Sequence, residues 1–288
     1  MAAVGRLSTL GSPFGERDRR ASELSKELPH ATEILGLYRA VLAEQARLYE
    51  WARTFSWRDP VSRREEEATL SLKQLPMRKL ERRFGDFCES LRRCGTDLLA
   101  TAGLALSRAT SVERTELLQL TVTRESPHVV AKSLGCEIAP LAFYSRAFLQ
   151  AVIETLAPAE AAVVGAAPRL SCPYCGWPPQ VAILRDEPDV KSRRLLQCAL
   201  CSASWSFPRL ACPGCGEIDS GKLLCHEVQT RAHLRVEECQ TCLGYLKTID
   251  LRQTGLAVPV VDDIASIELD IWATERGLSK ICLNLLGH

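Results

Sequence analysis

Four Cys-x-x-Cys pairs are the residues of this sequence best suited to chemistry. Two thiolates separated by two residues can bind one metal ion, because the tight turn between them brings both sulfurs to the same side, and Pro or Gly in the turn favours that backbone. The eight cysteines are Cys172, Cys175, Cys198, Cys201, Cys212, Cys215, Cys239 and Cys242. A single pair would equally suit buried apolar residues or a thioredoxin-type redox pair. Four pairs predict two metal sites with four thiolate ligands each.

The spacing of the pairs indicates how they combine. Between Cys175 and Cys198 lie 22 residues, and between Cys215 and Cys239 lie 23, close to the usual interval of a two-knuckle zinc site. Each interval contains two β-type runs around a turn-like segment, VAILR and RRLLQ around DEPD in the first and KLLCHEV and HLRVEE around QTRA in the second. A hairpin in each interval would return the second knuckle to the first. We therefore favour sequential pairing; the alternative joins the two inner knuckles and leaves the outer two to meet each other.

Sequential pairing predicts an internal duplication, with rubredoxin-like or zinc-ribbon units at residues 171–206 and 211–247. A unit of this length buries too small an apolar core to be stable alone. The metal should therefore contribute much of the folding free energy, which is about 10 to 16 kcal/mol for structural zinc in finger peptides. Four thiolates accept zinc or iron. Zinc would be structural, whereas iron could also cycle one electron.

Helical periodicity precedes the cysteine-rich region. Three amphipathic patterns are present: Ile34, Leu37, Tyr38 and Val41; Leu80, Phe84, Phe87, Leu91, Cys94 and Leu98; and Leu141, Tyr144, Phe148 and Val152. Steps of three and four residues place each set on one helix face. The segment APAEAAVVGAAP at 157–168 predicts the last helical turns running into a connector. The first 28 or so residues have clustered charge and no apolar periodicity, so we expect a mobile tail there.

Helical periodicity returns after the cysteine-rich region. Val260, Ile264, Ile267 and Ile271 follow at steps of four, three and four. Asp262 and Asp263 suit a helix N-terminus, where carboxylates meet free N–H groups, and Gly277 suits its end. The pattern predicts one helix from about 261 to 277 that docks on the helical bundle.

The predicted fold class is therefore α+β, an N-terminal helical bundle followed by two tandem rubredoxin-like or zinc-ribbon modules and a C-terminal helix. The predicted boundaries are 1–30 for a flexible N-terminal tail, 31–168 for the helical domain with its connector, 169–208 for the first module, 209–258 for the second module, and 259–288 for the C-terminal helix packing back on the helical domain.

Composition and charge limit the partners. The 288 residues include 36 Lys and Arg against 35 Asp and Glu, which gives no global attraction to nucleic acid or to an anionic membrane. Basic and acidic residues also balance over 171–250, and each divalent ion held by four thiolates adds about two negative charges, which disfavours contact with phosphates. No apolar run reaches the roughly 18 residues of a membrane-spanning helix, and the N-terminus lacks the apolar core of a secretory signal. We expect a cytoplasmic location and no membrane insertion; self-association is left open.

Five cysteines lie outside the knuckles. Cys88 and Cys94 fall within the second helical pattern and are expected in the core. Cys136 precedes a predicted helix, where the helix dipole can lower a thiol pKa, but no histidine partner is evident. Cys225, beside His226, is expected to be an ordinary strand residue, and Cys282 a core or surface residue.

The ordered series CPYCG, LLQCALCSASW, RLACPGCGE and EECQTCLGYLK, followed by VVDDIASIELDIWATERG, resembles the formate dehydrogenase accessory protein family, FdhE. The resemblance covers residues 171 to about 278 closely and the segment PLAFYSRAFLQAVIETL more loosely. The N-terminal third is similar only in being helical. The ordered set of knuckles with its closing helix is far more specific than any single knuckle.

The resemblance implies a cytoplasmic accessory factor, needed for active respiratory formate dehydrogenases, that binds the catalytic subunit of the enzyme before export. It implies two metal ions per chain, bound by the eight knuckle cysteines in a rubredoxin-like manner, with iron favoured and zinc as the alternative. No enzymatic activity is expected, since no P-loop, dinucleotide fingerprint or nucleophile elbow is present in the sequence. Two other functions are considered: a small iron-thiolate electron-transfer protein and a zinc-ribbon nucleic-acid-binding factor.

Overall fold

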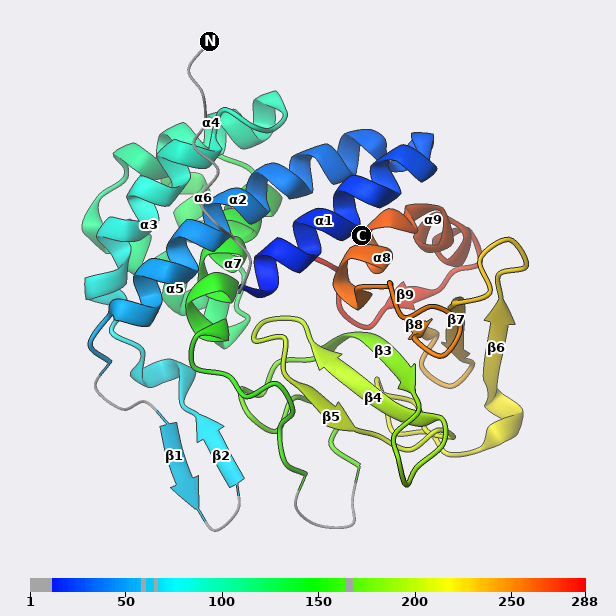
Figure 1. Ribbon diagram of the computed structural model, residues 1–288. Helices are drawn as coiled ribbons and strands as arrows, with labels where there is room; N and C mark the ends of the chain where they lie inside the picture. Colours follow the sequence, from blue (N-terminus) through cyan, green and yellow to red (C-terminus); the bar gives the residue numbers. More distant parts are fainter. Residues whose placement is uncertain (1–11, 58–60, 65–66, 164–167) are drawn as a thin grey trace.

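The computed structural model describes residues 12–57, 61–64, 67–163 and 168–288. The helices of the N-terminal half lie on one side of the molecule, and the cysteine-rich half forms a β-sheet on the other (Figure 1). The predicted α+β class is confirmed, because a helical N-terminal region precedes a sheet region that contains two groups of four cysteines.

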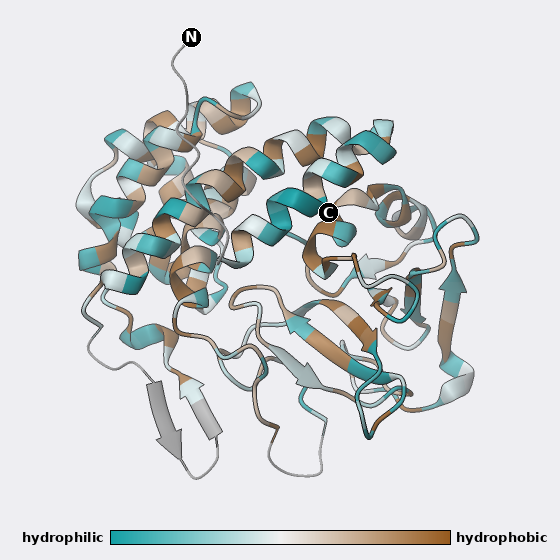
Figure 2. Ribbon diagram, in the orientation of Figure 1, coloured by the Kyte–Doolittle hydropathy of each residue, from teal (hydrophilic) through white to brown (hydrophobic). Residues whose placement is uncertain are grey.

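The helices of the N-terminal region pack around α7. Their bounds are α1 Pro13–Glu27, α2 Thr32–Thr54, α3 Met77–Leu91, α4 Asp97–Arg108, α5 Ser111–Thr123, α6 His128–Leu134 and α7 Ile138–Glu154. Hydrophobic and hydrophilic bands alternate along them (Figure 2). The Phe148 ring of α7 meets the rings of Phe84 and Phe87 of α3, with centroids 5.2 and 5.8 Å away. A short hairpin, β1 Val61–Arg64 and β2 Glu67–Leu70, connects α2 to α3. Among the described residues, no helix has the length and apolar content to cross a bilayer.

The segment predicted as a flexible tail contains a helix that packs on the core. The buried residues of α1 are Phe14, Arg17, Arg20, Ala21 and Leu24. Arg17 donates to Glu154 of α7 at 3.0 Å, and Arg20 donates two hydrogen bonds of 3.0 and 2.6 Å to Asp262. The tail prediction is therefore wrong for residues 13–27, because the arginines that indicated a solvated segment have buried carboxylate partners far along the chain. Residues 1–11 lie outside the described residues.

The second predicted helical pattern spans two helices rather than one. α3 ends at Leu91, and α4 begins after Thr96, whose hydroxyl accepts a hydrogen bond from the Leu99 N–H at 3.5 Å. Cys94 and Leu98, expected on a buried stripe, are exposed. The apolar spacing continued across the break by coincidence, while the Gly-Thr-Asp sequence at 95–97 carried the signal for a helix end followed by a new N-cap.

The sheet contains the cysteine-rich half of the chain. Its strands are β3 Pro179–Arg185, β4 Arg193–Cys198, β5 Ser204–Ser206, β6 Leu223–Glu227, β7 Leu234–Cys239, β8 Gly244–Asp250 and β9 Ser279–Lys280. The spatial order is β5-β4-β3-β8-β7-β6, with β9 beside β8. The antiparallel pairs β3–β4 and β6–β7 are the two hairpins that the sequence predicts.

A parallel pairing of β3 with β8 joins the two hairpin units into one sheet. The register runs from Val181 opposite Lys247 to Leu184 opposite Asp250. The units are therefore not separate modules on a string, as the tandem prediction would allow. Parallel strands require a long crossover connection, and local sequence patterns carry no information on which distant strand provides the partner.

The connector after α7 is not helical where it is described. α7 ends at Glu154, and Ala161 donates its N–H to the Ser204 carbonyl of β5 at 2.8 Å, while the Ser204 N–H donates to the Ala159 carbonyl at 3.0 Å. The prediction of helical turns at the start of 157–168 is wrong, because these backbone groups bond to the sheet edge instead of to one another. Residues 164–167 lie outside the described part of the chain.

The predicted C-terminal helix is two short helices, α8 Pro259–Ala265 and α9 Ile267–Glu275, separated at Ser266. The ammonium group of Lys247 donates to the carbonyl oxygens of Asp263 and Ser266 at 2.6 and 3.2 Å. A continuous helix needs these carbonyls for its own hydrogen bonds, so the prediction of one helix from 261 to 277 is wrong. α8 packs against α1 and α2 on one side and against β3 and β8 on the other.

Candidate metal centres

The four knuckles have a common backbone conformation. In ribbon 1 (residues 171–206) and ribbon 2 (residues 211–250), the residue after the first cysteine pair, Gly176 or Gly216, donates its N–H to the carbonyl of the first cysteine at 2.8 or 2.9 Å. Both glycines have positive φ, 77° and 82°, a conformation that Gly adopts without steric cost. After the second pair, Ser202 and Leu243 occupy the same region at φ 58° and 53°. The backbone thus shows the duplication that the cysteine spacing predicts.

The eight predicted ligands lie in two groups of four. Cluster 1 consists of Cys172, Cys175, Cys198 and Cys201, and cluster 2 consists of Cys212, Cys215, Cys239 and Cys242. Within each cluster the Sγ atoms lie within 4.8 Å of one another. The knuckles therefore combine sequentially, and the nested arrangement is excluded.

The separations between sulfurs fit metal coordination. Four sulfurs about 2.3 Å from a central ion form a tetrahedron with edges of about 3.8 Å. The closest Sγ–Sγ distances are 3.7 Å for Cys172–Cys201, 3.4 Å for Cys175–Cys198, 3.8 Å for Cys212–Cys242 and 3.7 Å for Cys215–Cys239. A disulfide needs about 2.05 Å, and every cysteine of the chain is free. The donor sets thus have the chemistry and the spacing to hold one ion each.

The electrostatics of the thiols also indicate a cation. Hydrogen bonds from the neighbouring thiols lower the pKa of Cys172, whereas burial raises the pKa of Cys198. Sulfurs this close cannot all ionise unless a positive charge lies between them. The Leu200 N–H donates to Cys198 Sγ at 3.4 Å and the Gly214 N–H to Cys212 Sγ at 3.3 Å, which favours the thiolate form. Zinc and iron both suit this donor set.

The helical domain covers cluster 1 through hydrogen bonds to its second knuckle. The Ala199 carbonyl accepts from Arg146 and Gln150 of α7 at 3.1 and 2.8 Å. Ser202 donates to Glu154 of α7 at 2.7 Å. Because these side chains come from one helix, α7 fixes the orientation of ribbon 1.

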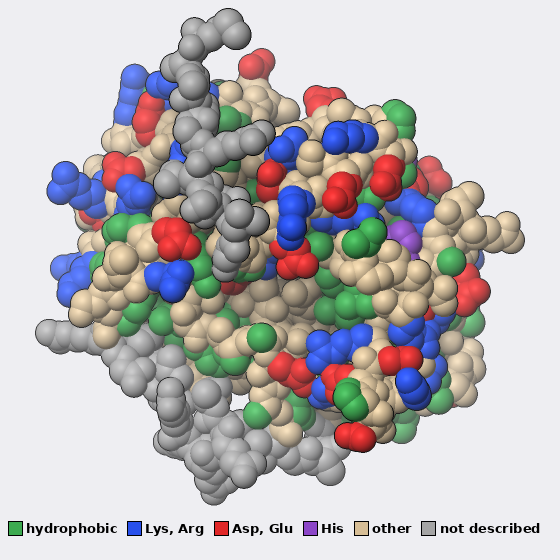
Figure 3. Space-filling model, viewed as in Figure 1, with side chains coloured by type: hydrophobic (Ala, Val, Ile, Leu, Met, Phe, Trp, Pro, Cys, Tyr) green, Lys and Arg blue, Asp and Glu red, His purple; other side chains and the backbone are tan. Residues whose placement is uncertain are grey.

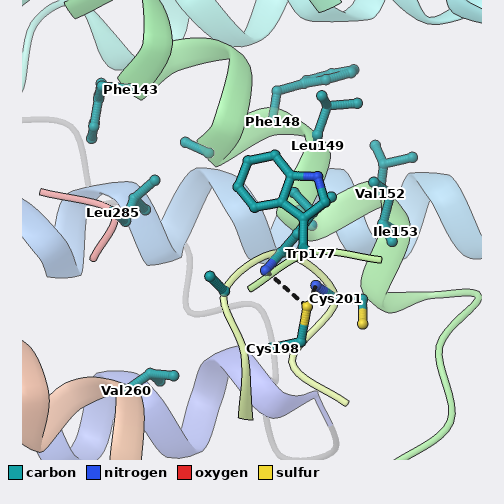
Figure 4. Close-up of a cluster of buried hydrophobic side chains, with 14 of the residues drawn as sticks. Phe143, Phe148, Leu149, Val152, Ile153, Trp177, Cys198, Cys201, Val260 and Leu285 are labelled. Carbon is teal, nitrogen blue, oxygen red and sulfur yellow. Dashed lines mark hydrogen bonds between the residues drawn. The ribbon is translucent and has the colours of Figure 1, made fainter. Parts of the chain in front are cut away.

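Apolar packing completes the burial of cluster 1. Figure 4 shows Trp177 among Leu149 and Val152 of α7 and the cysteines Cys198 and Cys201. The four sulfur ligands of this cluster belong to the same continuous core as α7. Cluster 1 is therefore part of the hydrophobic core and not an appendage to it.

Cluster 2 differs, because half of it reaches the surface. Cys212 and Cys239 are buried, while Cys215 and Cys242 are exposed. Its second knuckle is held by its own ribbon, where the Thr241 hydroxyl donates to the Glu217 carboxylate at 2.6 Å. The two centres have similar ligand geometry but different access to solvent.

A groove lies beside cluster 2, between the two ribbons. Its volume is about 430 Å³, and its lining includes Arg194, Leu210, Leu223, Cys225, Arg235 and Cys239. Arg194 is buried there and pairs with Glu237 of β7. The volume falls in the range of small-ligand sites, and two of the cations that line it, Arg194 and Arg235, have carboxylate partners within the chain. Because Cys212 and Cys239 line the groove, it gives access to cluster 2.

Sequence reasoning missed a buried ionic cluster between β8 and the C-terminal helices. The ammonium group of Lys247 lies 2.9 Å from a carboxylate oxygen of Asp263 and 2.6 Å from one of Asp270, and Lys280 lies 2.7 and 3.1 Å from the same two groups. Burial alone would raise the pKa of Asp263, but the two ammonium groups outweigh it and lower the pKa to about 2. Burial lowers the pKa of Lys247. The signal available in the sequence was a lysine in the middle of an apolar strand.

The capping prediction for the two aspartates needs correction. Asp262 accepts the Val258 N–H at the start of α8 at 2.9 Å, as a capping residue would, but it also binds Arg20 and His233. Asp263 is fully buried in the ionic cluster. Both carboxylates therefore connect α8 to distant elements, which a local capping argument could not foresee.

The remaining cysteines fall in different environments. Cys88 is buried, as expected. Burial raises the pKa of Cys136, which opposes a lowering by the helix dipole. Cys225 is exposed, and the neighbouring His226 hydrogen-bonds to Glu238 at 2.9 Å on the adjacent strand.

Comparisons with known proteins agree with these features. Residues 171–209 match the central domain of FdhE, and residues 210–286 match its C-terminal domain. A protein FdhE homolog of Aquifex aeolicus is 33% identical over 178 residues, which are 61% of this chain and 63% of that protein. A homolog of Pseudomonas aeruginosa is 37% identical over 131 residues, 44% of this chain and 42% of that protein.

A crystal structure of the FdhE protein from Pseudomonas aeruginosa has a similar fold, with a TM-score of 0.66, 24% sequence identity and 95% of each chain covered. The alignments with the curated relatives thus span about two fifths to two thirds of their length, whereas the similarity of fold extends over nearly the whole chain.

The fold and its two sulfur clusters define a helical protein fused to a pair of four-cysteine ribbons that share one sheet. The matched domains place it further: residues 171–286 are similar to the central and C-terminal domains of FdhE.

Proposed function

We propose that this protein is a cytoplasmic accessory factor for formate dehydrogenase, that it holds two metal ions, and that it binds the catalytic subunit of that enzyme without catalysing a reaction itself. The observation that carries the proposal is the pair of four-sulfur clusters with the spacing of metal thiolates, found in a segment that matches the central and C-terminal domains of FdhE. Its second support is the exposure of Cys215 and Cys242 at the surface of ribbon 2.

Metal content is the first test. We expect two ions per chain in protein prepared without air, because each cluster offers four thiolates. Iron is expected in preference to zinc, as the resemblance to FdhE implies. Elemental analysis against protein concentration gives the number, and the absorption spectrum gives the identity, since ferric thiolate is strongly coloured and zinc is colourless. Protein that contains no bound ion under these conditions would contradict the proposal.

Exposed apolar side chains lie close to the cysteines of cluster 2 along the chain. Leu210, Ile218 and Leu243 are exposed and lie within three residues of a knuckle cysteine. Clustered exposed apolar side chains are typical of protein contact sites. On the face shown in Figure 3, acidic and basic side chains are interspersed, which gives no support to the nucleic-acid-binding alternative. We propose that ribbon 2 provides the contact with the dehydrogenase subunit.

Replacing Leu243 should weaken this contact. Leu243→Asn removes an apolar side chain that is 54% exposed and places at φ 53° a residue that tolerates this conformation. We expect at least about tenfold weaker capture of the catalytic subunit, the effect of losing one interface anchor. Leu98→Asn is the matched control, because Leu98 is also 54% exposed but lies on α4. Equal capture by wild type and both variants would exclude ribbon 2 as the contact surface.

Electron transfer is the second candidate function, and the exposure of Cys215 and Cys242 favours it. Electrons reach an iron centre more readily when its ligands are at the surface. Reversible bleaching of the iron-loaded protein by a reductant, together with oxidation by a redox partner, would support this function. An iron centre that stays ferric under reductant would remove it.

A further inference from the structure

The internal duplication allows the two centres to be compared position by position. Ala199 and Ser202 of the second knuckle in ribbon 1 correspond to Gln240 and Leu243 in ribbon 2. In ribbon 1 both positions are hydrogen-bonded to α7. In ribbon 2 both positions are exposed. The same ligand geometry is thus placed once inside the core and once at the surface.

We propose that the two centres have different roles, with cluster 1 a closed structural site and cluster 2 an exchangeable site that can yield its ion to an external thiolate. The inference rests on the metal binding proposed above and adds a function to one of the two clusters. It follows from burial: the least buried sulfur residue of cluster 1, Cys175, is 7% exposed, whereas Cys215 and Cys242 of cluster 2 are exposed.

The exchange is a ligand substitution without electron transfer. The sulfur of an incoming thiolate would replace the sulfur of Cys215 or Cys242 on a bound ion, and the released cysteine thiolate would take a proton from water. Further substitutions of this kind would transfer the ion, with its charge unchanged, to the incoming ligand. The groove of about 430 Å³ offers the same route to the buried ligands Cys212 and Cys239, which line it.

At cluster 1 the same reaction needs a prior opening of the protein. An incoming ligand reaches the sulfurs only if α7 separates from the knuckle, which breaks the hydrogen bonds of Arg146 and Gln150 to Ala199. Such openings have free-energy costs that approach global unfolding in a core element. Release from cluster 1 should therefore be limited by opening of the protein, and release from cluster 2 by ligand attack.

The test uses the full chain loaded with two zinc ions and mixed with an excess of the coloured chelator 4-(2-pyridylazo)resorcinol. We expect two release phases of equal amplitude that differ in rate by at least about tenfold, the factor for 1.4 kcal/mol of opening free energy. Iodoacetamide added during the fast phase should label the cysteines of cluster 2 and leave those of cluster 1 unlabelled. Gln150→Ala should accelerate only the slow phase, because it loosens the cover of cluster 1.

The outcomes separate the inference from the proposed function. A chain that holds two ions but releases them at one rate, or labels cluster 1 first, overturns the inference and leaves metal binding intact. A chain that holds no ion overturns both.

Discussion

Cys198→Ser is expected to destabilise most of the molecule, whereas Cys215→Ser should affect chiefly the exposed knuckles of ribbon 2. Cys198 belongs to cluster 1, which shares one hydrophobic core with α7. A structural ion can contribute about 10 to 16 kcal/mol to folding, while a whole domain is stable by about 5 to 15 kcal/mol. Loss of this ligand should therefore leave ribbon 1 unfolded and uncover the face of α7 that packs against Trp177.

Thermal unfolding followed by circular dichroism and limited proteolysis will distinguish the two variants. Cys215→Ser should keep the melting transition of the helical domain and gain cleavage sites chiefly within 211–243, before β8. Cys198→Ser should lose that transition, or melt far below wild type. Cys88→Ser controls for the chemistry of the substitution, because Cys88 is a buried cysteine outside both clusters. Equal melting of the two ligand variants would show that the clusters contribute alike.

Asp263→Asn should have the second largest effect, a loss of about 3 to 5 kcal/mol of unfolding free energy, the usual cost of breaking a buried ion pair by removing one partner. The asparagine has nearly the same shape but leaves Lys247 and Lys280 with Asp270 as their remaining carboxylate. Urea unfolding gives the value. Asp18→Asn is the matched control, because Asp18 pairs with Arg39 at the surface and such pairs contribute about 0 to 1 kcal/mol.

The same variant predicts a pH dependence. The pKa of Asp263 is lowered to about 2 in the folded protein, against about 3.9 in an unfolded chain. The ionised carboxylate therefore stabilises the fold fully above the unfolded pKa, and its contribution is lost as the pH falls from about 4 to 2. The difference in unfolding free energy between wild type and Asp263→Asn should shrink over this interval. A difference that stays constant would show that Asp263 is not ionised in the folded state.

Local patterns were sufficient wherever the interacting residues are close in sequence. The knuckles depend on two intervening residues and a turn, and each hairpin depends on an interval of 22 or 23 residues, so the spacing predicted both the membership of each cluster and its hairpin. The helical patterns of α2 and α7 were found for the same reason, because a helix face repeats every three to four residues.

Local patterns were insufficient where the partner is distant. Arg20 donates a hydrogen bond to Asp262, which lies 242 positions away in the sequence. This contact helps to pack helix α1, in a segment whose charge had indicated exposure to solvent. Lys247 forms buried ion pairs with Asp263 and Asp270. These contacts coincide with the break in the C-terminal helix, and they place the Asp263 carboxylate in a buried ion pair instead of a helix cap. In the first case charge indicated solvent exposure and in the second it indicated a local helix cap, and only the buried partners show otherwise.

The sequence by itself determined the chemistry of this protein: eight thiols in four tight turns, paired in order, because metal ligation by a knuckle is a property of a few adjacent residues. The tertiary structure decided the difference between the two centres. α7 packs over one knuckle and leaves the equivalent knuckle of the other ribbon exposed. This difference depends on the parallel pairing of β3 with β8 and on the docking of ribbon 1 against the helices. Both are interactions between residues far apart in the sequence, so no local pattern predicts them.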